Sequence, residues 1–410
     1  MTLESCVATE KKPLLTVAEA KKRIHATISP LTEQERVSLK DAFQRVLAKA
    51  VFTPLNLPST RNSAMDGYAL SSEMFAETLT NVGTSWAGKP FERDLKSGEC
   101  VRIFTGAVLP ENADSVVMQE NVTVHGSKIE FPTDIKLKKN VREIGEDVRI
   151  GDLLCEASKT LSASDLGLLA STGIENVLVI RKLKIVYFST GDELVGLGES
   201  LERGKIYDSN RYSLFGLLQN QNYDVVDGGV IPDDKAALKN TLIQAAKEFD
   251  AVITTGGASV GEADYVKAVL EECGEIHFWK IAMKPGKPLA FGKIGKSYFF
   301  GLPGNPAAVT TTFDIIVKAA LVQLAGGIIK EPFQLTAICA TKLKKSRGRQ
   351  EFQRGILQQL ETGGFQVKST GNQGSHILST TSIANCYIVL PADCTEVRIG
   401  ESVTVMLQAI

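Results

Sequence analysis

Acidic side chains stand where apolar, strand-like runs of the sequence give way to polar turns. The run 183–188 leads into Ser189-Thr190-Gly191-Asp192-Glu193, and the run 224–231 ends at Pro232-Asp233-Asp234. Carboxylates such as the adjacent Asp192 and Glu193 are ionised at neutral pH unless they are buried without partners, and hard cations prefer oxygen ligands of this kind. These residue types therefore suit the binding of a cation.

A second kind of motif offers hydrogen-bond donors to anions. The segment 254–261 reads Thr-Thr-Gly-Gly-Ala-Ser-Val-Gly and exposes backbone N–H and hydroxyl groups, which suit a phosphate or another oxyanion. It is not a Walker A loop, because the Lys-[Ser/Thr] ending is missing, and it is not a GxGxxG motif. A tight turn between a strand and a helix is the alternative interpretation.

Two lysines lie three residues apart in the segment 283–288, which reads Met-Lys-Pro-Gly-Lys-Pro. A loop stiffened by proline that presents two cations suits an oxyanion, although a plain surface loop has the same composition. Further on, Asn305 and Pro306 are typical of the N-cap and the first residue of a helix that runs to about Leu324. The N-terminus of that helix carries roughly half a positive charge.

These motifs need a scaffold that brings strand ends together. Between residues 183 and 306, apolar runs of strand length each end in a polar turn, and a helical pattern follows most of them. This alternation predicts a parallel α/β sheet. The loops at the carboxyl ends of such strands form the binding crevice, so we expect the motifs to face one site for a polar ligand.

The flanking segments follow other patterns. Residues 16–19 form a capping-box pattern at the start of a helix, and residues 41–48 are predicted to form a second helix. Residues 68–147 indicate short strands, and residues 161–170 indicate a short helix that could pack with the N-terminal helices and make the first domain discontinuous. Residues 330–410 alternate as in a small β-barrel or sandwich.

Bulk properties exclude several classes of protein. A chain of 410 residues exceeds the usual size of one hydrophobic core, which predicts two to four domains, and a net charge of −1 gives no global attraction for nucleic acid or an anionic membrane. The seven cysteines show no CxxC spacing and the four histidines no HxxxH array, which argues against a disulfide framework or a zinc site. Without a signal-peptide pattern or an apolar run of spanning length, we expect a reduced, cytoplasmic protein.

Eight motifs occur in the same order in one known family. They are 62–69, 105–107 with 113–114, 145–147, 189–194, 255–264, 284–288, 301–306 and 374–376. On these residues, from about residue 14 to the end, the chain resembles the MoeA-type molybdopterin molybdenumtransferases, which are related to part of gephyrin. Taken alone, residues 62–69 suit a tight turn and residues 142–147 a solvated loop.

The resemblance implies an elongated α/β multidomain subunit that forms a homodimer. Its parts would be a discontinuous helical and linker domain, a β-rich inserted domain, a central doubly wound α/β domain of the MogA type, and a small C-terminal β-barrel. The corresponding ranges in this chain are 14–50 with 148–182, 51–147, 183–328 and 329–410.

The implied reaction joins molybdate to adenylylated molybdopterin in a Mg²⁺-dependent step that releases AMP and gives molybdenum cofactor. The site would lie in a cleft between domains and across the dimer interface. The resemblance also implies a transient contact with the molybdopterin adenylyltransferase. Two anionic substrates repel each other unless cations or N–H dipoles neutralise them, which agrees with the separate acidic and basic motifs.

The family motifs map onto individual positions. The implied catalytic residues are Asp66, Thr105, Asp147, Glu193, Asp233 and Asp264, and the implied metal ligands are Asp192, Glu193 and Asp264. The implied substrate-binding residues are Ser259, Lys280, Lys284, Lys287, Pro303, Pro306, Arg349 and Ser375. The pair Thr60-Arg61 departs from the family pattern, which often has an aromatic or acidic residue there.

Two other functions agree with parts of the pattern. Molybdopterin adenylyltransferases share the α/β domain type and a TxGG-Ser loop, but the region of Asp66 and the C-terminal β-domain would be surplus to that activity. A non-catalytic scaffold is the second alternative, because a protein related to this family clusters receptors. The retained acidic residues argue against a loss of chemistry.

Overall fold

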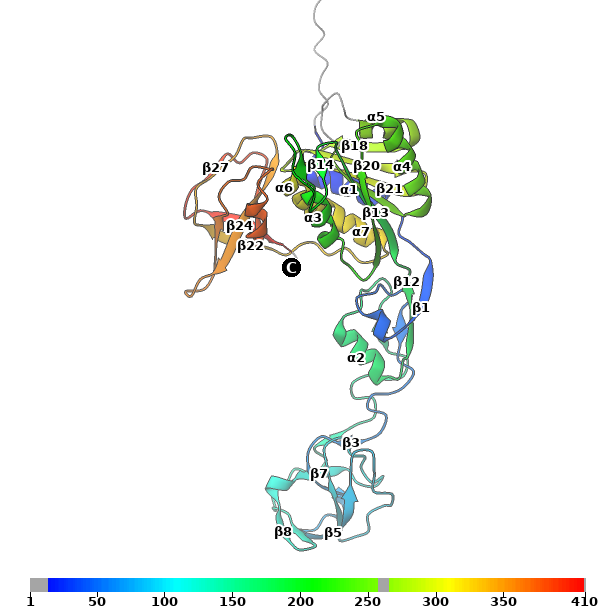
Figure 1. Ribbon diagram of the computed structural model, residues 1–410. Helices are drawn as coiled ribbons and strands as arrows, with labels where there is room; N and C mark the ends of the chain where they lie inside the picture. The colour runs from blue at the N-terminus through cyan, green and yellow to red at the C-terminus, as the bar shows by residue number, and fades with distance from the viewer. Residues whose placement is uncertain (1–13, 257–264, 409–410) are drawn as a thin grey trace, which may run out of the picture.

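The computed structural model describes residues 14–256 and 265–408. Figure 1 shows an elongated subunit with an inserted β unit at one end and a small linker unit next to it. The α/β unit and the C-terminal β unit lie side by side at the other end. The predicted fold class is confirmed, including the central α/β unit and the C-terminal barrel.

The α/β unit is built on a six-stranded mixed sheet. Its strand order is β16 (Tyr223–Ile231), β13 (Leu183–Thr190), β17 (Ala251–Thr255), β21 (Ser297–Leu302), β20 (Pro288–Ile294) and β18 (Glu275–Lys280). The first four strands are parallel, and β20 and β18 are antiparallel to their neighbours. Ile185 faces one hydrophobic core and Val186 faces the other, because successive side chains of a strand point to opposite faces.

Helices cover both faces of this sheet. One face carries α1 (Val17–Thr27), α3 (Ser209–Leu217), α6 (Pro306–Thr312) and α7 (Lys318–Leu324), and the other carries α4 (Lys235–Glu248) and α5 (Tyr265–Cys273). Helix α1 begins with the predicted capping box, in which the Glu19 amide donates to Thr16 Oγ1 at 3.2 Å and the Thr16 amide donates to Glu19 Oε2 at 2.8 Å. Helix α1 thus packs on the α/β core, although residues 14–50 are predicted to belong to the linker domain.

One long helix fills the core on the α1 side of the sheet. A π-helical turn, Phe313–Val317, joins α6 and α7 into a continuous helix from Pro306 to Leu324. By length and composition this 19-residue helix is apolar enough to cross a membrane. However, 72% of its most apolar 18-residue stretch is buried inside the protein. Packing in the core accounts for its apolar character.

The linker unit combines two distant stretches of the chain. In it β1 (Gln34–Ser38) pairs with β12 (Asn176–Ile180), β2 (Val51–Phe52) pairs with β11 (Leu153–Cys155), and α2 (Ala163–Ser171) covers them. The prediction of a helix at 41–48 is wrong: the chain makes one 3-10 turn, Lys40–Ala42, then a further turn at residues 43–44 and isolated bridges at Val46 and Leu47. The left-handed φ of Gln44, +58°, interrupts the turn, and Leu47 is buried by bridging to Val179.

The inserted unit is a β domain between the two stretches of the linker unit. Its sheet has the order β7 (Ser115–Met118), β4 (Gly67–Leu70), β6 (Glu99–Ile103), β5 (Thr78–Ser85), β9 (Lys128–Glu130) and β8 (Thr123–His125). Small hydrophobic cores lie on its two faces. Gly67 is required where β4 meets β7, because an added Cβ would lie 2.0 Å from the Val117 carbonyl oxygen.

Five strands close into a barrel at the C-terminal end. Around the barrel they are β24 (Gln350–Gln359), β25 (Phe365–Ser369), β22 (Gln334–Cys339), β28 (Ser402–Leu407) and β26 (Cys386–Leu390), and β26 pairs back with β24. A short strand from the α/β segment, β19 (Met283–Lys284), adds in parallel to β24 and places Lys284 opposite Glu351. The barrel is thereby coupled to the α/β unit.

Candidate active site

A cavity of about 1150 Å³ lies where the α/β unit meets the barrel. The turns after β13, β19 and β21 contribute to it from the α/β unit, and β24 and the loop 369–376 contribute from the barrel. Seven of the predicted site residues line this cavity: Glu193, Lys284, Lys287, Pro303, Pro306, Arg349 and Ser375. The fold thus brings together motifs that the sequence separates widely.

Among the described residues, basic side chains outnumber acidic ones around the cavity. The basic residues are Lys284, Lys287, Lys342, Lys344 and Arg349, and the acidic residues are Glu193 and Glu351. Pro306 begins the long helix, so the positive end of that helix adds to the same potential. An excess of positive charge in a confined site attracts anions, because charges interact more strongly there than in bulk water.

Lys284 is paired with a carboxylate that no sequence motif indicates. Its Nζ lies 3.2 Å from Oε1 of Glu351, whose side chain is only 3% exposed. The side-chain amide of Gln353 donates to the same oxygen at 3.0 Å. Lys284 is therefore not a free cation of the cavity, and its pairing with Glu351 follows from the register between β19 and β24.

Asp192 and Asp233 meet at the carboxyl edge of the sheet, where β13 and β16 end. The Asp233 amide donates to Asp192 Oδ1 at 3.1 Å, and the Asp192 amide donates to Asp233 Oδ2 at 3.5 Å. Both residues remain exposed while each carboxylate holds the other residue's backbone. The neighbouring Glu193 lines the cavity, so the acidic edge and the basic cavity adjoin each other.

Gly191 shapes the turn that carries these acids. Its φ is +141°, and a Cβ added there would lie 2.4 Å from Glu193 Oε2. The Glu193 carboxylate therefore folds back over the Gly191 backbone. Gly256, which follows β17, is constrained in a similar way, because an added Cβ would lie 2.5 Å from the Thr190 carbonyl oxygen.

The remaining predicted residues of the α/β segment are Ser259, Asp264 and Lys280. Ser259 and Asp264 lie outside the described residues. Lys280 ends β18, pairs with Pro288 of β20, and does not line the cavity. Within residues 14–256 and 265–408, no group of three His, Cys, Asp or Glu side chains is arranged to hold a metal ion.

Asp66 and Thr105 form a separate acidic site in the inserted unit. The Thr105 amide and hydroxyl donate to Asp66 Oδ1 at 2.7 and 2.8 Å. These two hydrogen bonds, the amide bond most strongly, hold the pKa of Asp66 below its ordinary value, and the nearby Arg102 guanidinium acts in the same direction. The carboxylate is therefore ionised and available to a ligand.

Asp66, Thr105 and Asp147 do not reach the cavity within one subunit. The Asp147 amide donates to the Leu57 carbonyl oxygen at 2.9 Å, where the inserted unit joins the linker unit. Figure 1 shows the inserted unit at the opposite end of the subunit from the α/β unit and the barrel. A site that contains all the predicted residues therefore needs a second subunit to supply these three.

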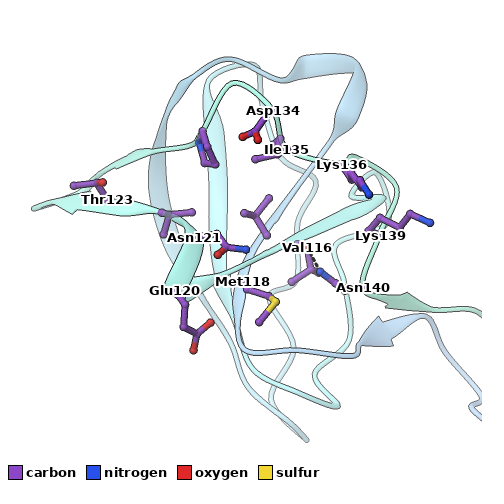
Figure 2. Close-up of a pocket in the computed structure, with 13 residues that line it drawn as sticks. Val116, Met118, Glu120, Asn121, Thr123, Asp134, Ile135, Lys136, Lys139 and Asn140 are labelled. Carbon is purple, nitrogen blue, oxygen red and sulfur yellow. Dashed lines mark hydrogen bonds between the residues drawn. The ribbon is translucent and has the colours of Figure 1, made fainter.

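The inserted unit has a hollow of its own, with a volume of about 740 Å³, beside β7 and the loop 131–140. Figure 2 shows Lys136 and Lys139 on one side of it and Glu120 on another. None of the predicted site residues lines this hollow, and its charges are mixed. We therefore place the candidate active site at the junction of the α/β unit and the barrel.

Known families match the chain in three consecutive segments. The MoeA N-terminal region (domain I and II) matches residues 15–173, a probable molybdopterin binding domain matches residues 187–323, and the MoeA C-terminal region (domain IV) matches residues 336–408. A molybdopterin molybdenumtransferase of Haemophilus influenzae is 44% identical over 96% of this chain and 98% of its own length. The chain belongs to the MoeA family.

Other MoeA relatives agree with this membership. A molybdopterin molybdenumtransferase of Nostoc is 33% identical over 96% of this chain and 94% of its own length. Gephyrin of Dictyostelium discoideum is 32% identical over 92% of this chain and 59% of its own length. The crystal structure of a molybdopterin biosynthesis MoeA protein of Pyrococcus horikoshii superposes with a TM-score of 0.82 at 30% identity, covering 96% of this chain and 100% of that one. The resemblance indicated by the sequence motifs is confirmed.

Gly191→Ala is expected to displace the Glu193 carboxylate, because the added methyl group would occupy its position. The AMP release expected of the family should fall by roughly ten- to a hundredfold, and the positive φ should cost about 1 kcal/mol of stability. Gly198→Ala is the matched control, since Gly198 has a φ of +87° but nothing lies within 4 Å of an added Cβ. Equal AMP release by the two variants would contradict a role for the Gly191 turn in placing Glu193.

Thr105→Val is expected to raise the pKa of Asp66, because the hydroxyl that stabilises the carboxylate is lost. Since the folded-state pKa of Asp66 is depressed, its charge persists to low pH in the native protein and should disappear at a higher pH in the variant. Titration of ¹³C-labelled aspartate carboxyls by NMR measures this change. Thr123→Val, in β8 of the same unit, should leave the Asp66 titration unchanged, and an unshifted pKa in Thr105→Val would refute the assignment.

Proposed function

We propose that this protein is a molybdopterin molybdenumtransferase, which joins molybdate to adenylylated molybdopterin and releases AMP. The observation that carries the proposal is the junction cavity, in which Lys287, Arg349 and Glu193 share one space of about 1150 Å³. A volume of that order suits a ligand larger than a simple anion. Similarity over the full length to transferases of this name supports the same activity.

The charges of the cavity suit two substrates that repel each other. Lys287 and Arg349 would bind molybdate, lysine as a point charge and arginine through its planar fork of donors. Ser375 would donate its hydroxyl to the same anion. The positive end of the helix that begins at Pro306 would lower the remaining repulsion between molybdate and the dithiolene sulfurs.

Mg²⁺ fits the acidic edge as a cation shared with the substrate. One or two of Asp192, Glu193 and Asp233 would hold it, because Mg²⁺ usually takes one or two carboxylates together with water and substrate phosphates. A ligand set completed by the substrate needs no closed cluster of protein side chains, and the described residues contain none. When bound, Mg²⁺ would neutralise phosphate charge and polarise the bond that is cleaved.

A homodimer is part of this proposal, because the α/β unit exposes several large apolar side chains. This exposed apolar surface has parts in the turn after β13, on α3 and on the edge strand β16. Its residues are each 42–60% exposed: Leu197, Leu201, Ile206, Tyr212, Phe215, Val226 and Val230. Monomeric proteins rarely expose large contiguous apolar patches. Ile206 also lines the cavity, so a second subunit bound here would stand at the rim of the site.

The dimer would supply the second half of the site. Phe52 and Ile150 are 56% and 64% exposed in the linker region near Asp147, and they offer an apolar counterpart to the α/β surface. If the linker of one subunit packs on the α/β unit of the other, Asp66 and Thr105 can close over the other subunit's cavity. A two-fold symmetric dimer would then contain two such composite sites.

The cysteines bear on the cellular compartment of the protein. The six described cysteines are free and four of them are buried, which suits a reducing compartment such as the cytoplasm. A transient contact with the molybdopterin adenylyltransferase would transfer the adenylylated substrate. Such contacts are commonly small, so we assign no surface to it.

The direct test supplies the purified protein with adenylylated molybdopterin, molybdate and Mg²⁺ and measures AMP. We expect AMP release that depends on molybdate and is lost when EDTA removes divalent cations, because phosphate charge is then left without its counter-ion. Consumption of ATP with free molybdopterin would instead identify an adenylyltransferase. No turnover in either assay would leave a scaffold as the better description.

Mixing two inactive variants tests the composite site. Asp66→Asn and Glu193→Gln are each expected to lose AMP release, since each removes one carboxylate from every site. A random mixture of refolded subunits should recover about a quarter of the wild-type rate, because half of the dimers are mixed and each mixed dimer has one intact site. Absence of any recovery, with mixed dimers shown by mass spectrometry, would contradict sites shared between subunits.

A surface variant controls this experiment. Phe215→Glu added to both variants should abolish the recovery, because it places a charge in the proposed interface. Ile399→Glu on the barrel replaces an equally apolar residue that is 68% exposed and should leave the recovery unchanged. Sedimentation of each protein reports the dimer directly.

A further inference from the structure

Arg354 of β24 is the largest fully buried side chain of the described structure, with no exposed surface. Its Nε donates to Thr380 Oγ1 at 3.0 Å. Its Nη2 donates to the carbonyl oxygens of Asn372 and Gly374, both at 3.1 Å. Arg354 therefore holds the loop 369–376, which forms part of the cavity wall.

The burial of this cation needs an explanation. Among the described residues Arg354 forms no salt bridge, and its Nη1 has no hydrogen-bond partner. Burial lowers the pKa of the guanidinium, as expected for a cation removed from water. The Glu351 carboxylate offsets part of this effect, but a buried charge without a direct ion pair is costly, so an apolar residue would serve stability better. The position is better explained by the loop that Arg354 holds.

The backbone of the loop shows what this contact achieves. The peptide bonds after Asn372 and Gly374 are trans, and in a trans peptide the C=O and N–H groups point in opposite directions. Because both carbonyls point at Arg354, the N–H groups of Gln373 and Ser375 point away from it. Neither amide donates to another described residue, and both residues line the cavity.

We propose that Arg354 is a positioning residue that turns the loop 369–376 so that the amides of Gln373 and Ser375 face the cavity as donors to a tetrahedral oxyanion. The proposal rests on the proposed function, and the oxyanion it assigns is molybdate. Paired backbone N–H groups of fixed direction are effective anion donors, because they need no reorganisation when the anion arrives. The positive charge behind the two peptides strengthens their dipoles in the same direction.

Two further contacts keep the loop in this shape. The Gly374 amide donates to Asn372 Oδ1 at 2.9 Å, and a Cβ at Gly374 would lie 3.0 Å from the His376 ring. The carbonyl oxygen of Ser375 accepts from the Ala307 amide at 3.1 Å, in the first turn of the long helix. The loop is thus fastened to the barrel by Arg354 and to the α/β unit by its other end.

The kinetic test compares Arg354→Lys with Arg45→Lys. Lysine keeps the charge but cannot bond both carbonyls and Thr380 together, so the KM for molybdate should rise by about tenfold or more, with the KM for adenylylated molybdopterin unchanged. Arg45 is also buried, bonds the Ile180 carbonyl oxygen at 2.9 Å, and lies in the linker unit, so its variant controls for lost stability. If the KM for molybdate and the KM for adenylylated molybdopterin changed equally in Arg354→Lys, or if its KM for molybdate did not change, the proposal would be overturned.

A structure of the wild-type protein with sodium molybdate alone tests the donors without a variant. The anion should lie with oxygens about 3 Å from the Gln373 and Ser375 nitrogens, and crystals with AMP alone should leave this position to solvent. Molybdate elsewhere in the cavity, or the AMP phosphate at the two amides, would refute the assignment. If wild-type AMP release depends on molybdate and the anion binds elsewhere, only this inference fails; if molybdate has no effect on turnover, the proposed function fails with it.

Discussion

The α/β unit and the barrel are joined by one short strand and one ion pair, next to a shared hydrophobic core that includes Phe352 and Tyr387 of the barrel. β19 pairs with β24 over two residues, and the Lys284 side chain then bonds Glu351, the residue opposite it, at 3.2 Å. Glu351 is buried, so removing Lys284, which is itself 41% exposed, would leave the Glu351 charge without its partner. The backbone pairing and the ion pair therefore fix the position of one cavity wall relative to the other.

Acidic and basic side chains occupy separate positions around this junction. The acids Asp192 and Asp233 are engaged by each other's backbone amides at the sheet edge, whereas Lys287 and Arg349 lie in the cavity next to them. Carboxylates mixed among these cations would pair with them, as Glu351 does with Lys284, and would leave fewer charges for ligands. Separation of the two signs keeps both available to a cation and to an anion at neighbouring positions.

Much of this arrangement could be predicted from the sequence, because its physical causes are local. Asp192 follows a strand-length apolar run and Pro306 begins a helix, so the sheet rule alone places both at the crevice. The helix predicted at 41–48 does not form; Val46 and Leu47 are buried where isolated bridges join them to Thr160 and Val179, and Phe43 is exposed. The roles of Glu351 and Arg354 could not be predicted, because each depends on contacts between segments far apart in the chain.

The chain passes through the linker unit twice, once before and once after the inserted unit. Both ends of the inserted unit leave and return through the short pairs β2–β11 and β3 (Asn62–Ser63)–β10 (Val141–Arg142), so a narrow base connects it to the rest of the molecule. A small rotation at that base would carry β5 and β8, at the far end of the inserted unit, through a longer arc than β3, which lies next to the linker unit (Figure 1). A tilt of this kind would move the inserted unit as one rigid piece and leave its two hydrophobic cores intact.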